Sequence, residues 1–254
     1  MFNLEYWSVS KKGTNHTKNE DSTLALNKLK DLNLALFMVC DGVGGYPGGD
    51  IASQKIVSTF SNKFYSMVDN SQNIEDFTRA TVAEVNKEIM EFASVNLQYP
   101  RLSSTLVGLI IDDEDYHAFS IGDSRIYKRD KTGFRQINED DSKVWGLFKS
   151  GLISKREIMT QEGKNKITAA VGFSKDFELH QYSAKLKDYN QFILCSDGLT
   201  DFVSEGDIEK ILSQEISVRE RCELLLNKAL DCGSDDDITI IVIEGTQDSQ
   251  FETV

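Results

Sequence analysis

The chain has 254 residues, of which 40% are hydrophobic and 27% are charged, an ordinary composition for a globular protein with a substantial core. Its 41 acidic residues outnumber its 28 lysines and arginines and give a formal net charge of −13. So acidic a surface repels phosphate backbones and anionic lipids, which excludes nucleic acid and membrane surfaces as expected partners.

The termini and the cysteines favour a cytoplasmic protein. The first residues, MFNLEYWSVSKK, lack the basic stretch and apolar core of a signal peptide, and no apolar run approaches the roughly 20 residues that span a bilayer. The four cysteines form no C-x-x-C pair. We therefore expect reduced thiols and a cytoplasmic location.

The hydrophobic pattern predicts strands and helices that do not alternate strictly. In chain order it indicates a strand at 34–40, helices at 51–67 and 74–92, a hairpin of strands at 105–111 and 116–121, a short helix after Ser154, a strand at 191–195, a helix at 218–229 and a strand at 238–244. Capping boxes at Ser154–Glu157 and Ser217–Glu220 open two of these helices.

This order of elements favours an antiparallel, layered α+β fold. No proline-, glycine- or serine-rich linker divides the chain, and no internal repeat is visible. We expect one domain over residues 1–245, followed by a polar, frayed tail at 246–254.

The glycine-rich stretch VCDGVGGYPGGD at 39–50 could be a phosphate-cradling loop, but it fits no nucleotide motif. Pro47 stands where a dinucleotide loop needs its third glycine, and Asp50 stands where a P-loop needs a cation. LCSDG at 194–198 lacks the first glycine of a nucleophile elbow. The three histidines are scattered and show no zinc spacing.

Aspartates at the ends of apolar strands carry a stronger signal. Asp41, Asp123 and Asp197 each end an apolar run, and Asp236 immediately precedes another. One such residue is usually only part of a turn, but four could converge at the edges of a layered sheet. Gathered carboxylates repel one another unless cations neutralise them, and oxygen ligands suit Mg²⁺ or Mn²⁺. Two such ions bridged by one carboxylate can direct attack on a phosphate ester.

The chain resembles the protein phosphatase 2C family of metal-dependent serine/threonine phosphatases, in its compact bacterial form. The segments that carry the resemblance occur in family order and are NEDS at 19, VCDGVGG at 39, SSTLVGLII at 103, SIGDSRIY at 120, DDSKVWGLFKSGLIS at 140, NKITAAVG at 165, LCSDGLTDFVS at 194 and DDDITIIVI at 235. The resemblance implies a four-layer α-β-β-α sandwich, two packed antiparallel sheets flanked by helices, with a variable flap at about 142–172.

The resemblance also implies site residues. Asp41 would bridge two Mn²⁺ or Mg²⁺ ions, and the carbonyl of Gly42 would bind one of them. The other implied residues are Asp197 and Asp236 in the core pair, Glu20 and Asp21 on metal-held water, and Asp123 with Asp197 at a third ion. A metal-activated water would then attack the phosphoryl group in line, without a phosphoenzyme.

Three departures from the family pattern affect the site. His16 occupies the position of the usual arginine that binds substrate phosphate, so it is a tentative phosphate ligand. Asp237 replaces the usual asparagine and either modulates metal or phosphate binding or is a solvated turn residue. Val43 occupies the place of the catalytic histidine of animal members, so the resemblance names no general acid.

The expected function is hydrolysis of phosphoserine and phosphothreonine in proteins, opposing a partner serine/threonine kinase and performed by a monomer. The alternative is a degenerate phosphatase-like module that binds phosphoproteins or regulates a partner without turnover. A metal-dependent hydrolase of another phosphoester is a third reading.

Overall fold

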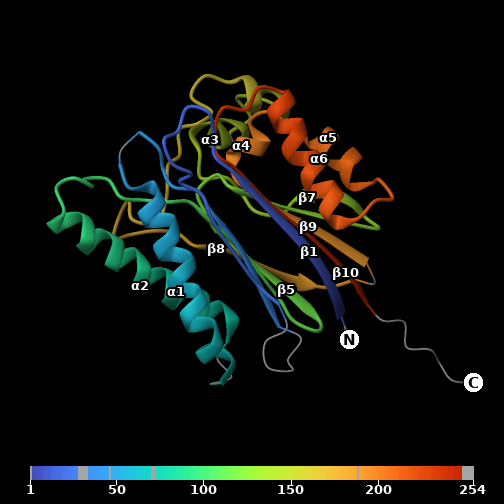
Figure 1. The fold of residues 1–254 in the computed structure, drawn as a ribbon, viewed down its shortest axis with the longest axis horizontal. Helices are drawn as coiled ribbons and strands as arrows, with labels where there is room; N and C mark the ends of the chain where they lie inside the picture. Colours follow the sequence, from blue (N-terminus) through green and yellow to red (C-terminus); the bar gives the residue numbers. More distant parts are fainter. Residues whose placement is uncertain (1, 28–33, 46, 70–72, 188, 248–254) are drawn as a thin grey trace, which may run out of the picture.

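Two antiparallel sheets pack face to face between two groups of helices (Figure 1). The computed structural model describes residues 2–27, 34–45, 47–69, 73–187 and 189–247. One sheet has the order β1 (Phe2–Lys11), β10 (Ile238–Gln247), β9 (Tyr189–Cys195), β6 (Arg125–Asp130) and β7 (Gly133–Gln136). The other has the order β2 (Ser22–Leu26), β3 (Ala35–Cys40), β4 (Leu106–Ile111), β5 (Asp115–Ile121) and β8 (His180–Lys185). The predicted α-β-β-α sandwich is confirmed.

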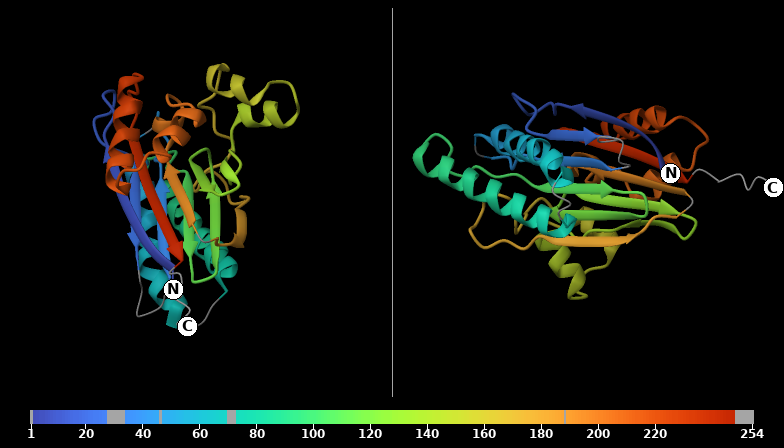
Figure 2. Two further views of the ribbon diagram at one scale, coloured as in Figure 1. Left: turned by 90° about the vertical axis from the view of Figure 1, so that its right-hand side faces the viewer. Right: turned by 90° about the horizontal axis from the view of Figure 1, so that it is seen from below.

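The outer layers are helical. Helices α1 (Gly49–Asp69) and α2 (Ile74–Val95) cover the sheet that contains β3, and α4 (Asp197–Thr200), α5 (Glu205–Leu212) and α6 (Val218–Asp231) cover the sheet that contains β10 (Figures 1 and 2). The capping box predicted at the start of α6 is present, with Ser217 and Glu220 exchanging hydrogen bonds. It satisfies amide groups that have no partner within the helix.

Strand β3 shows why its sequence is apolar without alternation. Its side chains point alternately to the two faces of the sheet, and both faces are covered. Leu36 and Met38 pack in the cluster under α1 and α2, whereas Phe37 and Val39 pack between the two sheets. A run that is buried on both sides ends abruptly at Asp41, and this change from apolar to charged marks the site.

Residues between β7 and β8 form an excursion that leaves the sandwich (Figure 2, left). It contains α3 (Lys143–Lys149) and the 3₁₀ helix η1 (Lys155–Thr160), which pack through a small core of Val144, Trp145 and Ile158. Its base is closed by backbone hydrogen bonds from Lys143 to Lys166 and from Thr168 to Asp141.

The predicted elements are all present, with boundaries that shift by up to three residues. The short helix expected after Ser154 is the 3₁₀ helix η1. Strand β10 runs to Gln247, paired with Phe2 of β1, so the start of the tail at 246 was predicted wrongly, and residues 248–254 lie outside the described part. Strands β1, β2, β6, β7 and β8 and helices α3, α4 and α5 were not predicted. None of the helices described is long and apolar enough to cross a membrane.

Candidate metal and phosphate site

The acidic residues meet at one end of the sandwich, where strand ends from both sheets approach each other. Asp41 and Asp123 follow β3 and β5 of one sheet, and Asp197 and Asp236 adjoin β9 and β10 of the other. All four line a cleft of about 240 Å³. The predicted convergence of these carboxylates is therefore seen in the structure.

The carboxylates of the cleft destabilise one another's charged forms. Burial raises the pKa of Asp41 and of Asp197 well above the usual range, and the neighbouring aspartates raise it further. Burial is also the main reason why the pKa of Asp123 rises to about 7 and that of Asp236 rises. Cations that enter the cleft would reverse these shifts.

Asp21 stands beside Asp41 because β2 pairs with β3, with Ser22 opposite Cys40. Ser196 donates a hydrogen bond of 2.9 Å to one oxygen of Asp21, whereas its other oxygen, Oδ1, is buried without a hydrogen-bond partner. Burial raises the pKa of Asp21 to about 7. Glu20 lies at the adjoining surface with His16, and its pKa is raised by burial and then by Asp50.

The donor set fits hard divalent cations such as Mg²⁺ and Mn²⁺. It consists of carboxylate oxygens with raised pKa values and one buried oxygen, Asp21 Oδ1, that lacks a partner. Among the described residues, however, no group of three or more histidine, cysteine, aspartate or glutamate side chains lies close enough together to hold a metal ion by itself. Backbone carbonyls and water would therefore complete the ligands of an ion in the cleft.

Gly42 is required at the rim of the cleft by close backbone packing. A Cβ on Gly42 would lie 2.4 Å from the backbone carbon of Gly49, at the start of α1. The residue is also fixed by a hydrogen bond from its amide to the carbonyl of Glu20. This contact with the first residue of α1 is the reason why a residue without a side chain is needed at position 42.

His16 lies on the cleft between two carboxylates. Its Nδ1 is 3.0 Å from Asp237 Oδ2, and its Nε2 is 3.6 Å from Asp236 Oδ1. The hydrogen bond to Asp237 is the main cause that raises the pKa of His16 above its ordinary value of 6.5. The imidazole is therefore held in one orientation, with Nε2 at the mouth of the cleft.

Asp237 is a buried bracing residue, so its interpretation as a solvated turn residue is wrong. Its side chain is only 3% exposed and accepts hydrogen bonds from the amides of Gly13 and Glu20, each 2.7 Å long. With the bond to His16, these contacts fix the N-terminal loop against the start of β10. This role could not be predicted from local sequence, because the partners are more than 200 positions away.

We expect Asp237→Asn to lower the free energy of unfolding by about 1–3 kcal/mol, because an amide nitrogen would face a buried donor. The loop that carries His16 and Glu20 would then loosen, and the Michaelis constant for phosphate esters would rise. Urea unfolding and steady-state kinetics measure both effects. The matched control is Asp235→Asn at the exposed neighbouring position, for which we expect changes within about 0.5 kcal/mol. Equal stability of the two variants would contradict the bracing role.

The sequence analysis did not predict two ion pairs near the cleft. Asp140 binds Arg125 at 2.6 Å, with both side chains nearly buried, and Lys164 of the excursion binds Asp201 at 2.7 Å. Lys164 also lies with Asp123 and Asp197 around a small cavity of about 10 Å³ behind the cleft. The DDS motif at 140–142 was the available signal for Asp140, but its arginine partner could be found only from the pairing of strands.

Comparison with known proteins agrees with this geometry. The family described as Protein phosphatase 2C matches residues 11–232. The serine/threonine phosphatase stp of Listeria monocytogenes is 33% identical over 214 residues, which cover 84% of this chain and 85% of the relative.

Solved structures show the same fold. Serine/threonine phosphatase Stp1 from Staphylococcus aureus superposes on this chain with a TM-score of 0.86 at 27% identity. The aligned part covers 96% of this chain and 95% of the Stp1 chain. The catalytic domain of the serine/threonine phosphatase PstP, solved in complex with two manganese ions, gives a TM-score of 0.83 at 25% identity over 97% of this chain and all of that one.

Proposed function

The chain belongs to the protein phosphatase 2C family, and from that membership we propose which of its residues perform the hydrolysis. It is a metal-dependent serine/threonine protein phosphatase, and its substrates are phosphoproteins. The observation that supports our assignment is the gathering of four aspartates from two sheets around one cleft.

We assign two Mn²⁺ or Mg²⁺ ions to this cleft, with Asp41 shared between them. Asp197 and Asp236 would supply further oxygens, as would the carbonyl of Gly42. Asp123 would hold a third ion with Asp197, and Glu20 and Asp21 would accept hydrogen bonds from water in the ion shells. Support comes from the raised pKa values of the aspartates and the unpartnered oxygen of Asp21.

When bound, the ions would lower the pKa of a coordinated water and offset the charge that develops on the phosphoryl group. The chain's own part is to position the ions, the attacking water and the phosphoryl group. Among the described residues that line the cleft, the only hydroxyl is that of Thr105, which already accepts a hydrogen bond from the amide of Asp41 and bonds to Ser124. The cleft therefore offers no free hydroxyl or thiol among the described residues, which favours direct attack by water over a phosphoenzyme formed on serine, threonine or cysteine.

We further propose that His16 binds the substrate phosphate in place of the usual arginine. Because Asp237 raises the pKa of His16, the imidazolium persists to a higher pH than an isolated histidine would allow. The charge is present below this raised pKa and is lost as the pH rises through it. Its Nε2–H, which faces Asp236 across 3.6 Å at the cleft lining, can then donate to a phosphate oxygen that enters the cleft.

His16→Arg is expected to lower the Michaelis constant for p-nitrophenyl phosphate severalfold at pH 8.5 and to flatten its rise with pH, because arginine stays charged. His16→Ala should raise the constant mainly at pH 6–7. Kinetics of the wild type and both variants over pH 6–9 separate this effect from titration of the metal site, which all three share. Parallel profiles would show that His16 does not contact phosphate.

The remaining assignments complete the proposal. We propose a monomeric, cytoplasmic enzyme with one catalytic domain, which extends to the end of β10 at Gln247 rather than to residue 245, and with the excursion at about 142–172 as its flap. A serine/threonine kinase would supply its substrates, since phosphoserine and phosphothreonine are the products of such an enzyme.

One assay tests the proposed site directly. The protein is incubated with p-nitrophenyl phosphate and with a phosphothreonine peptide, in Mn²⁺, in Mg²⁺ and in EDTA, while isothermal titration measures the number of ions bound. We expect turnover of both substrates with either metal, none in EDTA, and at least two bound ions. Metal binding without turnover would instead indicate a module that only binds phosphoproteins.

A further inference from the structure

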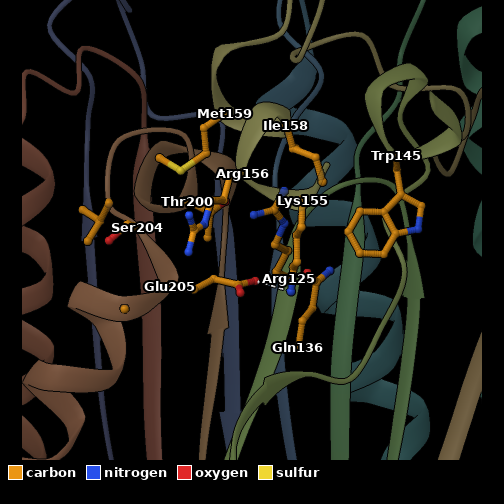
Figure 3. Close-up of a pocket in the computed structure, with 12 residues that line it drawn as sticks. Arg125, Gln136, Trp145, Lys155, Arg156, Ile158, Met159, Thr200, Ser204 and Glu205 are labelled. Carbon is orange, nitrogen blue, oxygen red and sulfur yellow. Dashed lines mark ion pairs between the residues drawn. The ribbon is translucent and has the colours of Figure 1, made fainter. Parts of the chain in front are cut away.

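A second pocket, larger than the metal cleft, lies between the flap and the α4–α5 segment (Figure 3). Its volume is about 610 Å³, which is within the range of sites that hold a ligand or a large side chain. Trp145 and the residues of η1 line one side, and Val203 to Gly206 line the other. Arg125 of β6 and Gln136 of β7 form its floor.

The pocket adjoins the metal cleft through shared residues. The small cavity behind the cleft is lined by Asp123 and Asp197, which also line the cleft, and by Arg125, Ile158 and Thr200, which also line the large pocket. A peptide whose phosphorylated residue lies in the cleft therefore has the large pocket within reach of its neighbouring residues, each of which spans about 3.3 Å when extended.

The pocket has apolar walls and, among the described residues that line it, one cation without an ion pair. Trp145, Ile158, Met159 and Val203 give it apolar walls. The cations Arg125 and Lys155 are paired with Asp140 at 2.6 Å and with Glu205 at 2.9 Å. Arg156 also lines the pocket, and its guanidinium forms no ion pair within the described part of the chain. In addition, Gln136 Oε1 and Trp145 Nε1 are buried without hydrogen-bond partners.

We propose that this pocket is a specificity subsite that receives a large apolar side chain of the substrate phosphoprotein, with an adjacent carboxylate held by Arg156. The acidic cleft cannot supply this selection, because it repels carboxylates. Among the described residues that line the pocket, Arg156 is the one cation without an ion pair, and its side chain is exposed, so a carboxylate can be bound there without complete desolvation. This inference rests on the phosphatase site proposed above.

Gly206 offers a way to fill the pocket without disturbing the fold. It lies in α5, lines the pocket, and a Cβ added to it would meet no atom within 4 Å. Gly206→Leu would therefore insert apolar atoms at the pocket wall while improving the helix propensity of α5. Gly146→Leu is the matched control, since Gly146 is an exposed glycine of α3 with equally open space and does not line the pocket.

The test measures kcat/KM of the manganese-loaded enzyme on phosphothreonine peptides that carry a Leu-Glu pair at each position within four residues of the phosphothreonine, in an alanine and glycine background. We expect that, for one position of the Leu-Glu pair, kcat/KM exceeds that of the peptide without the pair by on the order of tenfold. Gly206→Leu should abolish this preference, and Gly146→Leu should keep it. Arg156→Glu should exchange it for a preference for Leu-Lys at the same position. All four proteins should hydrolyse p-nitrophenyl phosphate equally.

The outcomes separate this inference from the proposed function. A wild type that prefers no position, a preference that survives Gly206→Leu, or a parallel loss on p-nitrophenyl phosphate would overturn the subsite. A preference that Arg156→Glu leaves unchanged would overturn the role of Arg156. Failure of the wild type to hydrolyse any of the substrates would instead refute the phosphatase site itself.

Discussion

Asp41→Asn is expected to lower kcat/KM toward a phosphothreonine peptide by about 10³-fold or more, even at saturating Mn²⁺. Asp41 lies at the cleft where its charge interacts with that of Asp21, Asp197, Asp123 and Asp236, so it is the residue best placed to be shared between two ions. An amide at this position keeps the shape but offers a cation only one neutral oxygen. Steady-state kinetics measures the loss, and isothermal titration should show weaker Mn²⁺ binding in parallel.

The neighbouring aspartates provide graded comparisons. Asp197→Asn should match Asp41→Asn, because Asp197 would serve two ions as well. Asp123→Asn should keep the core pair and increase mainly the Mn²⁺ concentration required for full rate. Near wild-type activity of the Asp41 variant at saturating Mn²⁺ would refute the assigned mechanism, and its folded state can be checked by thermal unfolding.

The metal-free protein should become less stable as the pH rises from about 5 to 8. The folded-state pKa is about 7 for Asp21 and Asp123 and is well above the usual range for Asp41 and Asp197, whereas the unfolded value is near 3.8. The folded state therefore binds more protons than the unfolded state over this interval. The stability that the raised pKa values contribute is present below pH 4 and is lost as the pH rises through about 7.

The size of this effect makes it measurable. One pKa unit corresponds to about 1.4 kcal/mol, and 1 kcal/mol moves the melting temperature of a domain of this size by about 2–4 °C. A single carboxylate with a pKa of about 7 accounts for a fall in melting temperature of about 5–10 °C between pH 5 and 8 in EDTA. We therefore expect a fall of at least this size, and we expect saturating Mn²⁺ to reverse the trend.

The same series on Asp41→Asn provides the control. Removing one of the repelling carboxylates should raise the melting temperature in EDTA at pH 8, although it abolishes activity, and should reduce the gain from Mn²⁺. A wild-type melting temperature that is independent of pH in EDTA would show that the carboxylates do not interact as strongly as their burial indicates.

The sequence contains a local signal for the candidate site residues, but it contains no such signal for the pairing of the strands that carry them. Asp41, Asp123, Asp197 and Asp236 each adjoin an apolar run, and the change from apolar to acidic is a local signal. What local pattern cannot give is the meeting of these runs. The cleft depends on β9 and β10 pairing in one sheet and β3 and β5 flanking β4 in the other, and such pairings are set by contacts between distant residues.

Of the strands that were missed, β6 carries charged residues in buried positions. Strand β6 reads RIYKRD, which does not look like a core strand. Lys128 is nevertheless 1% exposed, because its amine lies 3.2 Å from Asp130 and 4.6 Å from the ring centre of Tyr116. Compensation of this kind comes from tertiary neighbours, so hydropathy alone could not reveal the strand. The buried role of Asp237 was missed for the same reason, because its three hydrogen-bond partners come from the other end of the chain.

The excursion between Asp141 and Thr168 has its two ends joined by a backbone hydrogen bond and a core of its own. An insertion built in this way can change length and composition while the strands beneath it keep their register. The walls of the pocket that Trp145 and Arg156 line could thus diverge between paralogues without altering the carboxylates to which we assign hydrolysis. One hydrolytic scaffold could in this way acquire new targets during evolution, and exchange of this segment between relatives is the corresponding route for engineering.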